Sequence, residues 1–310
     1  MTTVLQARSL TKRYGEVTAV NDLSLEVCEG EVFGLLGPNG AGKTTSINMI
    51  CGLLKPDAGQ VTIRGKVITN GDASIRSRVG VCPQNIVLWG QLTCLEQMQF
   101  IGEMYGMRGK AARARGEKLL KELDLIEKKN KLARTLSGGM QRRLNLAMAL
   151  VHDPEILVLD EPEAGLDPQS RVMVRDYVKS LARQKTIIIT THNMDEADRM
   201  ADRVAIMDHG RLLTVDTPEA LKNTVGEGDV LEIDLDGGLM DEALCVLNPI
   251  VPQVAATNHT LVVRARGMVE QLPAILEALH AVDARPGEVR LRANTLEDVF
   301  ITLTGRRLRE

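Results

Sequence analysis

The sequence predicts an α/β fold with a buried parallel sheet, preceded by a small antiparallel sheet and followed by a small α+β appendix. Runs of mainly apolar residues occupy positions 32–36, 156–159 and 186–191. Such runs suit central parallel strands that are buried on both faces. Open α/β sheets bind their ligands at the carboxyl ends of these strands, and each of the three runs is followed by residues suited to chemistry.

The first run leads into a glycine-rich loop and then into a helix-like segment at 46–50. The loop matches the phosphate-binding pattern G-x-x-x-x-G-K-[ST] in the strand-to-helix context that the pattern requires. Its glycines let backbone N–H groups converge on phosphate oxygens, and the helix N-terminus adds a partial positive charge. A glycine-rich turn that binds nothing would not account for the Lys-Thr pair. The loop residues are Gly37, Pro38, Asn39, Gly40, Ala41, Gly42, Lys43, Thr44 and Thr45.

Length and composition are those of an ordinary globular protein. A chain of 310 residues exceeds the size at which single cores usually stop growing, so two domains are expected. The net charge of −3 gives no general electrostatic reason to bind nucleic acid or anionic lipid. No run approaches the roughly 20 apolar residues that span a bilayer, so no direct membrane insertion is expected. Scattered cysteines indicate a reduced, cytosolic setting: Cys28, Cys51, Cys82, Cys94 and Cys245.

Two segments near the start predict the small antiparallel sheet. Residues 4–7 and 23–27 alternate apolar and polar side chains, as half-exposed strands do. Tyr14 lies between them in a chain with only 2% aromatic residues. A tyrosine near a strand end packs more often than it stacks on a ligand, so both interpretations of Tyr14 remain open on this evidence alone.

A further strand and several helices are predicted after the phosphate loop. Gln84 follows the short apolar run 79–82 at a point where proline turns the path. Thr93 with Glu96 three residues later predicts a capped helix start. From 108 to 132, charged residues interleave with leucines at helical spacing, which predicts solvated amphipathic helices.

Polar residues at three other element ends carry further chemistry. Ser137-Gly138-Gly139 open a long helix, where backbone N–H groups favour an anion, although a plain serine cap is the alternative. Asp160 follows the second apolar run and fits the Mg²⁺-side acid of a phosphoryl-transfer site. Glu161 is placed to orient or deprotonate the attacking water. His192 follows the third run at the same sheet edge, and this position indicates contact with the γ-phosphate.

In this order, these elements resemble the ATP-binding subunit of ATP-binding cassette (ABC) transporters over residues 4–221. The signature Leu136-Ser137-Gly138-Gly139 separates that family from other phosphate-loop proteins. The resemblance implies a phosphate-loop ATPase domain at 1–221, with a mixed central sheet, an antiparallel β subdomain and a helical insert at about 86–152. The α+β appendix then occupies 222–310.

The resemblance also implies a role for each matching residue. Tyr14 stacks on adenine, and Gln84 senses the γ-phosphate and couples the helical insert to a membrane partner. Ser137 and its two glycines bind the nucleotide of the opposite subunit, and Gly165-Leu166-Asp167 match the D-loop. ATP is held by the phosphate loop, where Lys43 reaches the β- and γ-phosphates. The expected Mg²⁺ ligands are Thr44, Gln84 and Asp160, and the expected catalytic residues are Glu161, His192 and Gln84.

One phosphate loop and one signature per chain require two cassettes facing head to tail, most simply as a two-fold homodimer. ATP holds the cassettes together, and hydrolysis lets them part. The expected partners are transmembrane permease subunits and no nucleic acid, with the chain peripheral on the cytoplasmic face of the cell membrane. Trp89 lies where the family receives the coupling helix of the membrane subunit, with core packing as the alternative.

Glu163 departs from the family pattern, which commonly has Thr or Ser before the Gly-Leu-Asp. A third carboxylate near Glu161 raises the proton affinity of its neighbours, unless it points to solvent or pairs with a base. We therefore hypothesise that Glu163 slows basal hydrolysis or meets a cation of the partner chain.

The appendix begins after a glycine-rich join, Gly226-Glu227-Gly228. Alternating strand-like and helix-like segments predict its α+β structure. It ends in a capped helix from Thr295 to Gly305, which resembles the tail of the exporter branch that includes daunorubicin-type drug efflux. This resemblance favours export, while a helix that only stabilises the appendix is an equal alternative.

Two other function classes compete with a transporter ATPase. A soluble ABC ATPase acting on ribosomes or DNA usually has two cassettes in one chain or a long coiled-coil insert, and neither is present in the sequence. A GTP switch or small-molecule kinase would not explain the signature. The substrate is not predicted, because in this family the membrane subunit forms the pathway.

Overall fold

The computed structural model describes residues 2–68, 77–225, 229–236, 239–257, 259–265 and 267–305. The chain divides after Pro218 into two compact units, each of which has its own core. The sequence predicted a division at 221, and the predicted join at 226–228 lies outside the described residues. None of the helices in the described ranges is long and apolar enough to cross a membrane.

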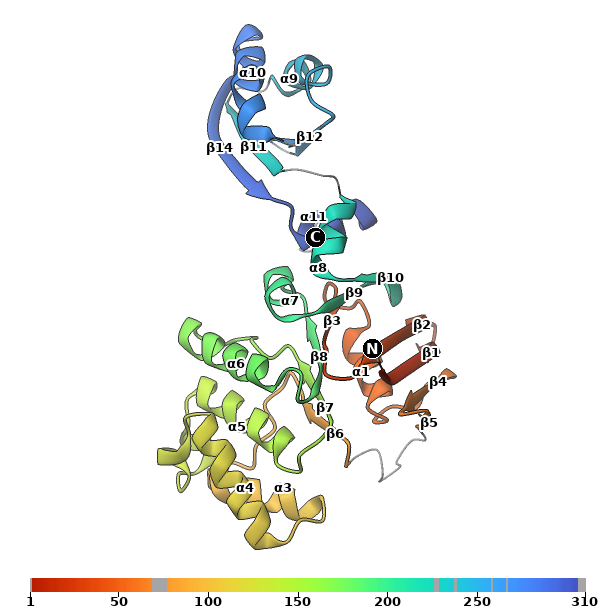
Figure 1. The fold of residues 1–310 in the computed structure, drawn as a ribbon, viewed down its shortest axis with the longest axis vertical. Coiled ribbons are helices and arrows are strands. Elements are labelled where there is room, and N and C mark those ends of the chain that lie inside the picture. Colours follow the sequence, from red (N-terminus) through yellow and green to blue (C-terminus); the bar gives the residue numbers. More distant parts are fainter. Residues whose placement is uncertain are drawn as a thin grey trace. The chain divides into compact units, whose positions relative to one another are not determined.

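The first unit contains two sheets (Figure 1). The central sheet has the strand order β10-β9-β3-β8-β7-β6 and is parallel except for the antiparallel edge strand β10, so it is mixed, as predicted. The second sheet is antiparallel, in the order β2-β1-β4-β5. The strands are β1 (Thr3–Tyr14), β2 (Val17–Cys28), β3 (Val32–Leu36), β4 (Ala58–Ile63), β5 (Lys66–Val67), β6 (Val79–Cys82), β7 (Ile156–Asp160), β8 (Thr186–Thr191), β9 (Arg203–Asp208) and β10 (Arg211–Asp216).

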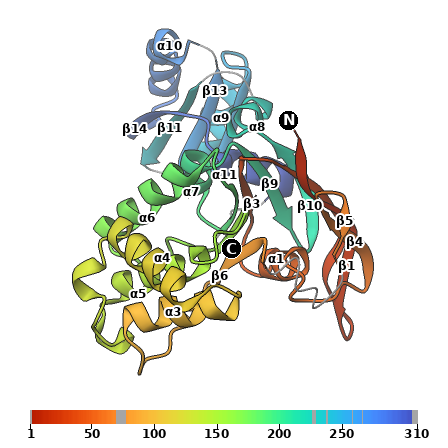
Figure 2. The same ribbon diagram turned by 60° about the horizontal axis from the view of Figure 1, so that its bottom comes forward.

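Helices α3, α4, α5 and α6 cover one face of the central sheet, whereas α1 and the antiparallel sheet lie on the other face (Figure 2). Successive strand residues point to opposite faces. Leu157 and Leu159 therefore join the core under the helical insert, whereas Ile156 and Val158 join the core under α1. This explains why β7 is apolar from Ile156 to Leu159. The helices are α1 (Lys43–Ile50), α3 (Cys94–Met104), α4 (Gly109–Glu122), α5 (Gly138–Leu150), α6 (Pro168–Leu181) and α7 (Met194–Met200), with 3₁₀ turns η1 (Ile126–Lys128) and η2 (Ala133–Thr135).

The second unit is the predicted α+β appendix. Its antiparallel sheet has the order β12-β13-β11-β14, and α9 and α10 contribute to its apolar core. The short strand β12 was not predicted, and neither were β9 and β10 of the first unit. The elements are α8 (Pro218–Thr224), β11 (Asp229–Asp236), α9 (Met240–Leu247), β12 (Gln253–Thr257), β13 (Thr260–Ala265), α10 (Met268–Ala281), β14 (Arg285–Ala293) and α11 (Leu296–Thr304).

Candidate functional site

The glycine-rich loop connects β3 to α1 and closes around its own lysine. Gly42 precedes the helix with φ of 97°, and a Cβ there would lie 2.4 Å from the carbonyl oxygen of Ala19. Only glycine fits this position without strain. The buried Lys43 Nζ donates to the carbonyl oxygens of Gly37 at 2.8 Å and Pro38 at 3.0 Å. The loop therefore presents an ammonium group where the sequence predicts phosphate binding.

Asp160 at the end of β7 meets the first turn of α1. Thr44 Oγ1 donates to Asp160 Oδ2 over 3.1 Å, and Thr190 Oγ1 of the neighbouring strand donates to the other carboxylate oxygen. Hydroxyl and carboxylate oxygens are the ligand type that Mg²⁺ prefers. The residues present at this point therefore fit the ion that the sequence implies.

Glu161 turns sharply away from the strand and contacts both a cation and an imidazole. Its φ is 50°, which is uncommon for a residue other than glycine, and its N–H donates to the Thr190 carbonyl oxygen over 3.0 Å. Its carboxylate lies 2.7 Å from His192 Nδ1 and 3.8 Å from Lys43 Nζ. Burial lowers the pKa of Lys43, against the opposing effect of Glu161 and Asp160. The structure thus brings Lys43, Glu161 and His192 together at one strand edge.

Arg142 in α5 is a residue of this region that the sequence analysis did not single out. Its guanidinium group is buried and donates all its described hydrogen bonds to backbone carbonyl oxygens, at 2.6–3.1 Å. Every residue has a backbone carbonyl group, so residue types in the sequence do not reveal these contacts. Only the neighbouring signature indicated that α5 has a functional role. The acceptors belong to Pro83, Gln84, Asp160, Glu161 and Pro162.

The signature and the D-loop lie against each other within the chain. Ser137 Oγ accepts from the Met140 N–H over 3.3 Å, which is a serine cap on α5. A Cβ on Gly139 would lie 2.2 Å from Ser170 Oγ at the start of α6, so glycine permits this close approach. Asp167 caps α6 through the Ser170 N–H at 3.0 Å. The described contacts hold the signature on α6 rather than on the phosphate loop of the same chain.

Three residues expected to meet ligands or partners are exposed. Tyr14 at the end of β1 is 53% exposed, and Lys12 Nζ lies 5.8 Å from its ring centroid. The Gln84 side chain is exposed, while its carbonyl oxygen is held by the buried arginine of α5. Trp89 is half exposed and packs its ring against Phe100 in an edge-to-face contact at 5.1 Å. Their expected roles therefore remain predictions.

Glu163 is buried and paired within the chain. Arg175 Nε and Nη2 donate to its two carboxylate oxygens over 2.8 and 3.1 Å, and Arg171 Nε lies 3.7 Å away. Glu163 therefore pairs with a base of its own chain rather than with the hypothesised cation of the partner chain, and its effect on basal hydrolysis stays a prediction.

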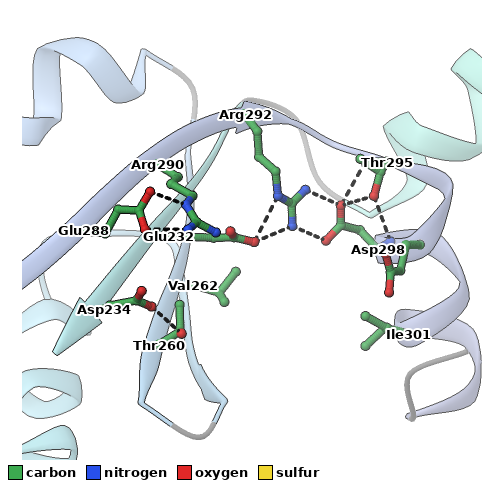
Figure 3. Close-up of a pocket in the computed structure, with 11 residues that line it drawn as sticks. Glu232, Asp234, Thr260, Val262, Glu288, Arg290, Arg292, Thr295, Asp298 and Ile301 are labelled. Atoms are coloured by element: carbon green, nitrogen blue, oxygen red, sulfur yellow. Dashed lines mark hydrogen bonds and ion pairs between the residues drawn. The ribbon is translucent and has the colours of Figure 1, made fainter. Parts of the chain in front are cut away.

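A second charged cluster lies in the C-terminal unit, and the sequence analysis did not anticipate it (Figure 3). Arg292 of β14 donates to Glu232 of β11 and to Asp298 of α11, and Arg264 Nη2 also donates to Asp298 over 3.0 Å. Burial alone would raise the pKa of Asp298, but hydrogen bonds from Arg292 and Thr295 lower it well below its usual range. Glu232, Arg292, Thr295 and Asp298 border a pocket of about 420 Å³.

The strand-edge geometry of the first unit defines a class of protein. A phosphate loop that meets two carboxylates and a histidine at the ends of adjacent parallel strands is the arrangement of a phosphate-loop nucleotide hydrolase. Residues 20–164 match the family model described as ABC transporter.

Whole-chain relatives narrow this class. The chain is 41% identical to the Nod factor export ATP-binding protein I of Ralstonia nicotianae, covering 100% of this chain and 96% of the relative. It is 36% identical to the daunorubicin resistance ATP-binding protein of Streptomyces coeruleorubidus, covering 99% and 98%. A linearmycin resistance ATP-binding protein of Bacillus subtilis is 35% identical, with coverage of 99% and 100%. The chain belongs to the ABC transporter ATP-binding subunits and is an ATPase of that family.

Solved structures agree on the fold of the first unit. An ATP-binding subunit of an ABC transporter superposes with a TM-score of 0.66 at 27% identity, covering 72% of this chain and 93% of that chain. A dimeric ATP-binding cassette in a post-hydrolysis state, bound to ADP and Pi, gives 0.63 at 29% identity, covering 69% and 98%. ABC ATPases bind ATP, dimerise and work with transmembrane partners.

Proposed function

We propose that this chain hydrolyses Mg²⁺-ATP to drive export through separate membrane subunits. The observation that carries the proposal is the contact of Lys43, Glu161 and His192 beside the Thr44–Asp160 pair. Whole-length similarity to ATP-binding proteins of export and drug-resistance systems supports the direction of transport.

The residues divide the chemistry among them. Lys43 binds phosphate oxygens in place of the two loop carbonyl oxygens that it now contacts. Thr44 and Asp160 would hold Mg²⁺, which supplies neutralisation of phosphate charge when it is bound. Glu161 orients the attacking water and takes its proton, and His192 is near enough to that carboxylate to orient it. Tyr14 stacks on adenine, and the Gln84 side chain joins the site from the start of the helical insert.

The complete hydrolytic site requires two chains. One phosphate loop and one signature lie in each chain, and the described contacts hold Ser137 on its own helix rather than beside Lys43. A two-fold homodimer supplies the signature of each chain to the nucleotide of the other. We place this dimer on the cytoplasmic face of the membrane, with the surface around Trp89 against a permease subunit.

The test is to isolate the full chain from its native cells in mild detergent and to identify stoichiometric partners by mass spectrometry. A polytopic membrane protein, together with ATP hydrolysis that Glu161→Gln abolishes, is expected. Ribosomal or DNA-repair proteins without a membrane partner would overturn the export proposal and indicate a soluble machine.

A further inference from the structure

A buried charged group lies beside the residues proposed for hydrolysis but has no part in that proposal. Glu163, two residues after Glu161, is 6% exposed, and Arg175 of α6 holds both of its carboxylate oxygens. Two-point pairs between guanidinium and carboxylate groups are strong and fix the geometry of both partners. The segment that follows Glu161 is thereby fastened to α6.

Glu196 in the first turn of α7 is a second buried carboxylate of this group, with 5% exposure. Thr191 Oγ1 donates to its Oε2 over 2.5 Å, whereas its Oε1 is buried without a hydrogen-bond partner among the described residues. Burial raises the pKa of Glu196 to about 7. The Thr191 hydrogen bond and Arg175 lower this pKa, and the charges of Glu163 and Glu161 raise it.

Thr191 connects Glu196 to the turn that carries His192. Its hydroxyl oxygen accepts a hydrogen bond from the Asn193 N–H over 2.9 Å. This bond closes the turn around His192, which lies between Thr191 and Asn193. Asn193 Oδ1 in turn accepts the N–H groups of Asp195 and Glu196 at 3.0 and 3.2 Å, which caps α7. Without the Glu196 carboxyl group, the Thr191 hydroxyl loses its acceptor and is free to rotate, so the turn loses one anchor.

We propose that Glu196 is a positioning residue for His192, acting through Thr191. The inference rests on the proposed function, because its readout is ATP hydrolysis. His192 Nδ1 lies 2.7 Å from the Glu161 carboxylate, so a displaced turn changes the contact that orients this carboxylate.

The first test compares variants of the full chain in an ATPase assay. Glu196→Ala is expected to lower kcat about tenfold with KM for ATP unchanged, because a misplaced group slows the reaction without weakening phosphate binding. Glu196→Gln keeps an oxygen for Thr191 and is expected to restore most of kcat. Asp195→Asn removes an exposed charge from the same turn and is the matched control. Equal kcat in Glu196→Ala and the wild type, or in Glu196→Ala and Glu196→Gln, would overturn the proposal.

The second test is the pH profile of kcat. It tests the role of Glu196 even if the Glu196→Ala variant folds poorly. The wild type is expected to show an inflection near the Glu196 pKa of about 7 that is absent from Glu196→Gln. In Glu163→Gln this inflection is expected to move to lower pH, because the Glu163 charge, which raises the pKa of Glu196, is removed. Profiles identical to the wild type in both variants would contradict the proposal, whereas a wild type that hydrolyses no ATP would contradict the proposed function instead.

Discussion

The two units each contain a charged cluster, and the clusters differ in how far their charges are satisfied. In the C-terminal unit, Arg292 donates two hydrogen bonds to Asp298, and the pKa of each moves in the direction that favours its charged form. In the first unit, Lys43 is held by carbonyl oxygens and lies 3.8 Å from Glu161, and burial moves its pKa toward the neutral form.

This difference separates a structural cluster from a binding site. Charges that saturate one another stabilise the fold and leave little for a ligand. Charges that are desolvated but incompletely paired raise the free energy of the empty site, and a ligand of opposite charge releases that free energy when it binds. The cluster around Lys43 has this second character, so its residues are expected to matter for activity more than for stability.

The largest expected effect is on turnover. Glu161→Gln removes the group that takes the proton and is expected to lower kcat about a thousandfold, because general bases contribute on that scale. MgATP binding and ATP-dependent dimerisation should persist, as measured by nucleotide titration and light scattering. Full turnover in this variant would refute the role assigned to Glu161.

In the C-terminal unit the largest effect should be on stability. Asp298→Asn leaves Arg292 and Arg264 without their shared carboxylate and is expected to cost about 3 kcal/mol, as breaking a buried ion pair does. Urea unfolding of the full chain measures this change, since Trp89, the only tryptophan, reports the first unit and circular dichroism reports both. A shift confined to the Trp89 signal would contradict the assignment.

Lys43→Ala should weaken ATP binding more than it changes the stability of the fold. Loss of a charged hydrogen-bond donor to phosphate is expected to weaken ATP binding at least about tenfold. The thermal midpoint without nucleotide should stay the same or rise, because the variant no longer buries an ammonium group. A clear fall in this midpoint would show that Lys43 is part of the structural framework.

The smallest effect is a difference in pH dependence. The folded-state pKa of Asp298 is lowered, so its contribution to stability is present above the unfolded pKa of 3.8 and is lost as pH falls through the folded value. The stability difference between wild type and Asp298→Asn should therefore stay constant near neutral pH and shrink as pH falls below about 4. The lowered pKa of Lys43 has the opposite meaning at neutral pH, where its charged form destabilises the fold until alkali removes the proton. Lys43→Ala should show no matching loss in acid.

The sequence was most informative where function follows from position along a strand. Asp160, Glu161 and His192 were identified because parallel strands bring their carboxyl ends to one edge. Thr44 was identified from the phosphate-loop pattern, and the structure brings it to the same edge. Local chemistry was also readable, as in the capping box of Thr93 and Glu96.

Contacts between distant segments were not readable in this way. The pairs Glu163–Arg175 and Glu232–Arg292 depend on the direction of side chains across a loop and across a sheet. Nothing in the spacing of these residues encodes that direction. The strand β12 (Gln253–Thr257) was also missed, because the segment is short and forms a strand through its pairing with β13.

Arg142 limits how the helical insert can be exchanged between relatives of this chain. Its one guanidinium group joins the signature helix to backbone on both sides of the insert, at Gln84 and at Glu161. Replacing the insert with that of a relative therefore succeeds only when the graft carries an arginine at this position and the receiving loops keep the same backbone path. Lysine cannot substitute, because a point charge lacks the planar fork that reaches so many acceptors at once. An insert that is exchanged between relatives should therefore begin before Gln84 and end after the first turns of α5.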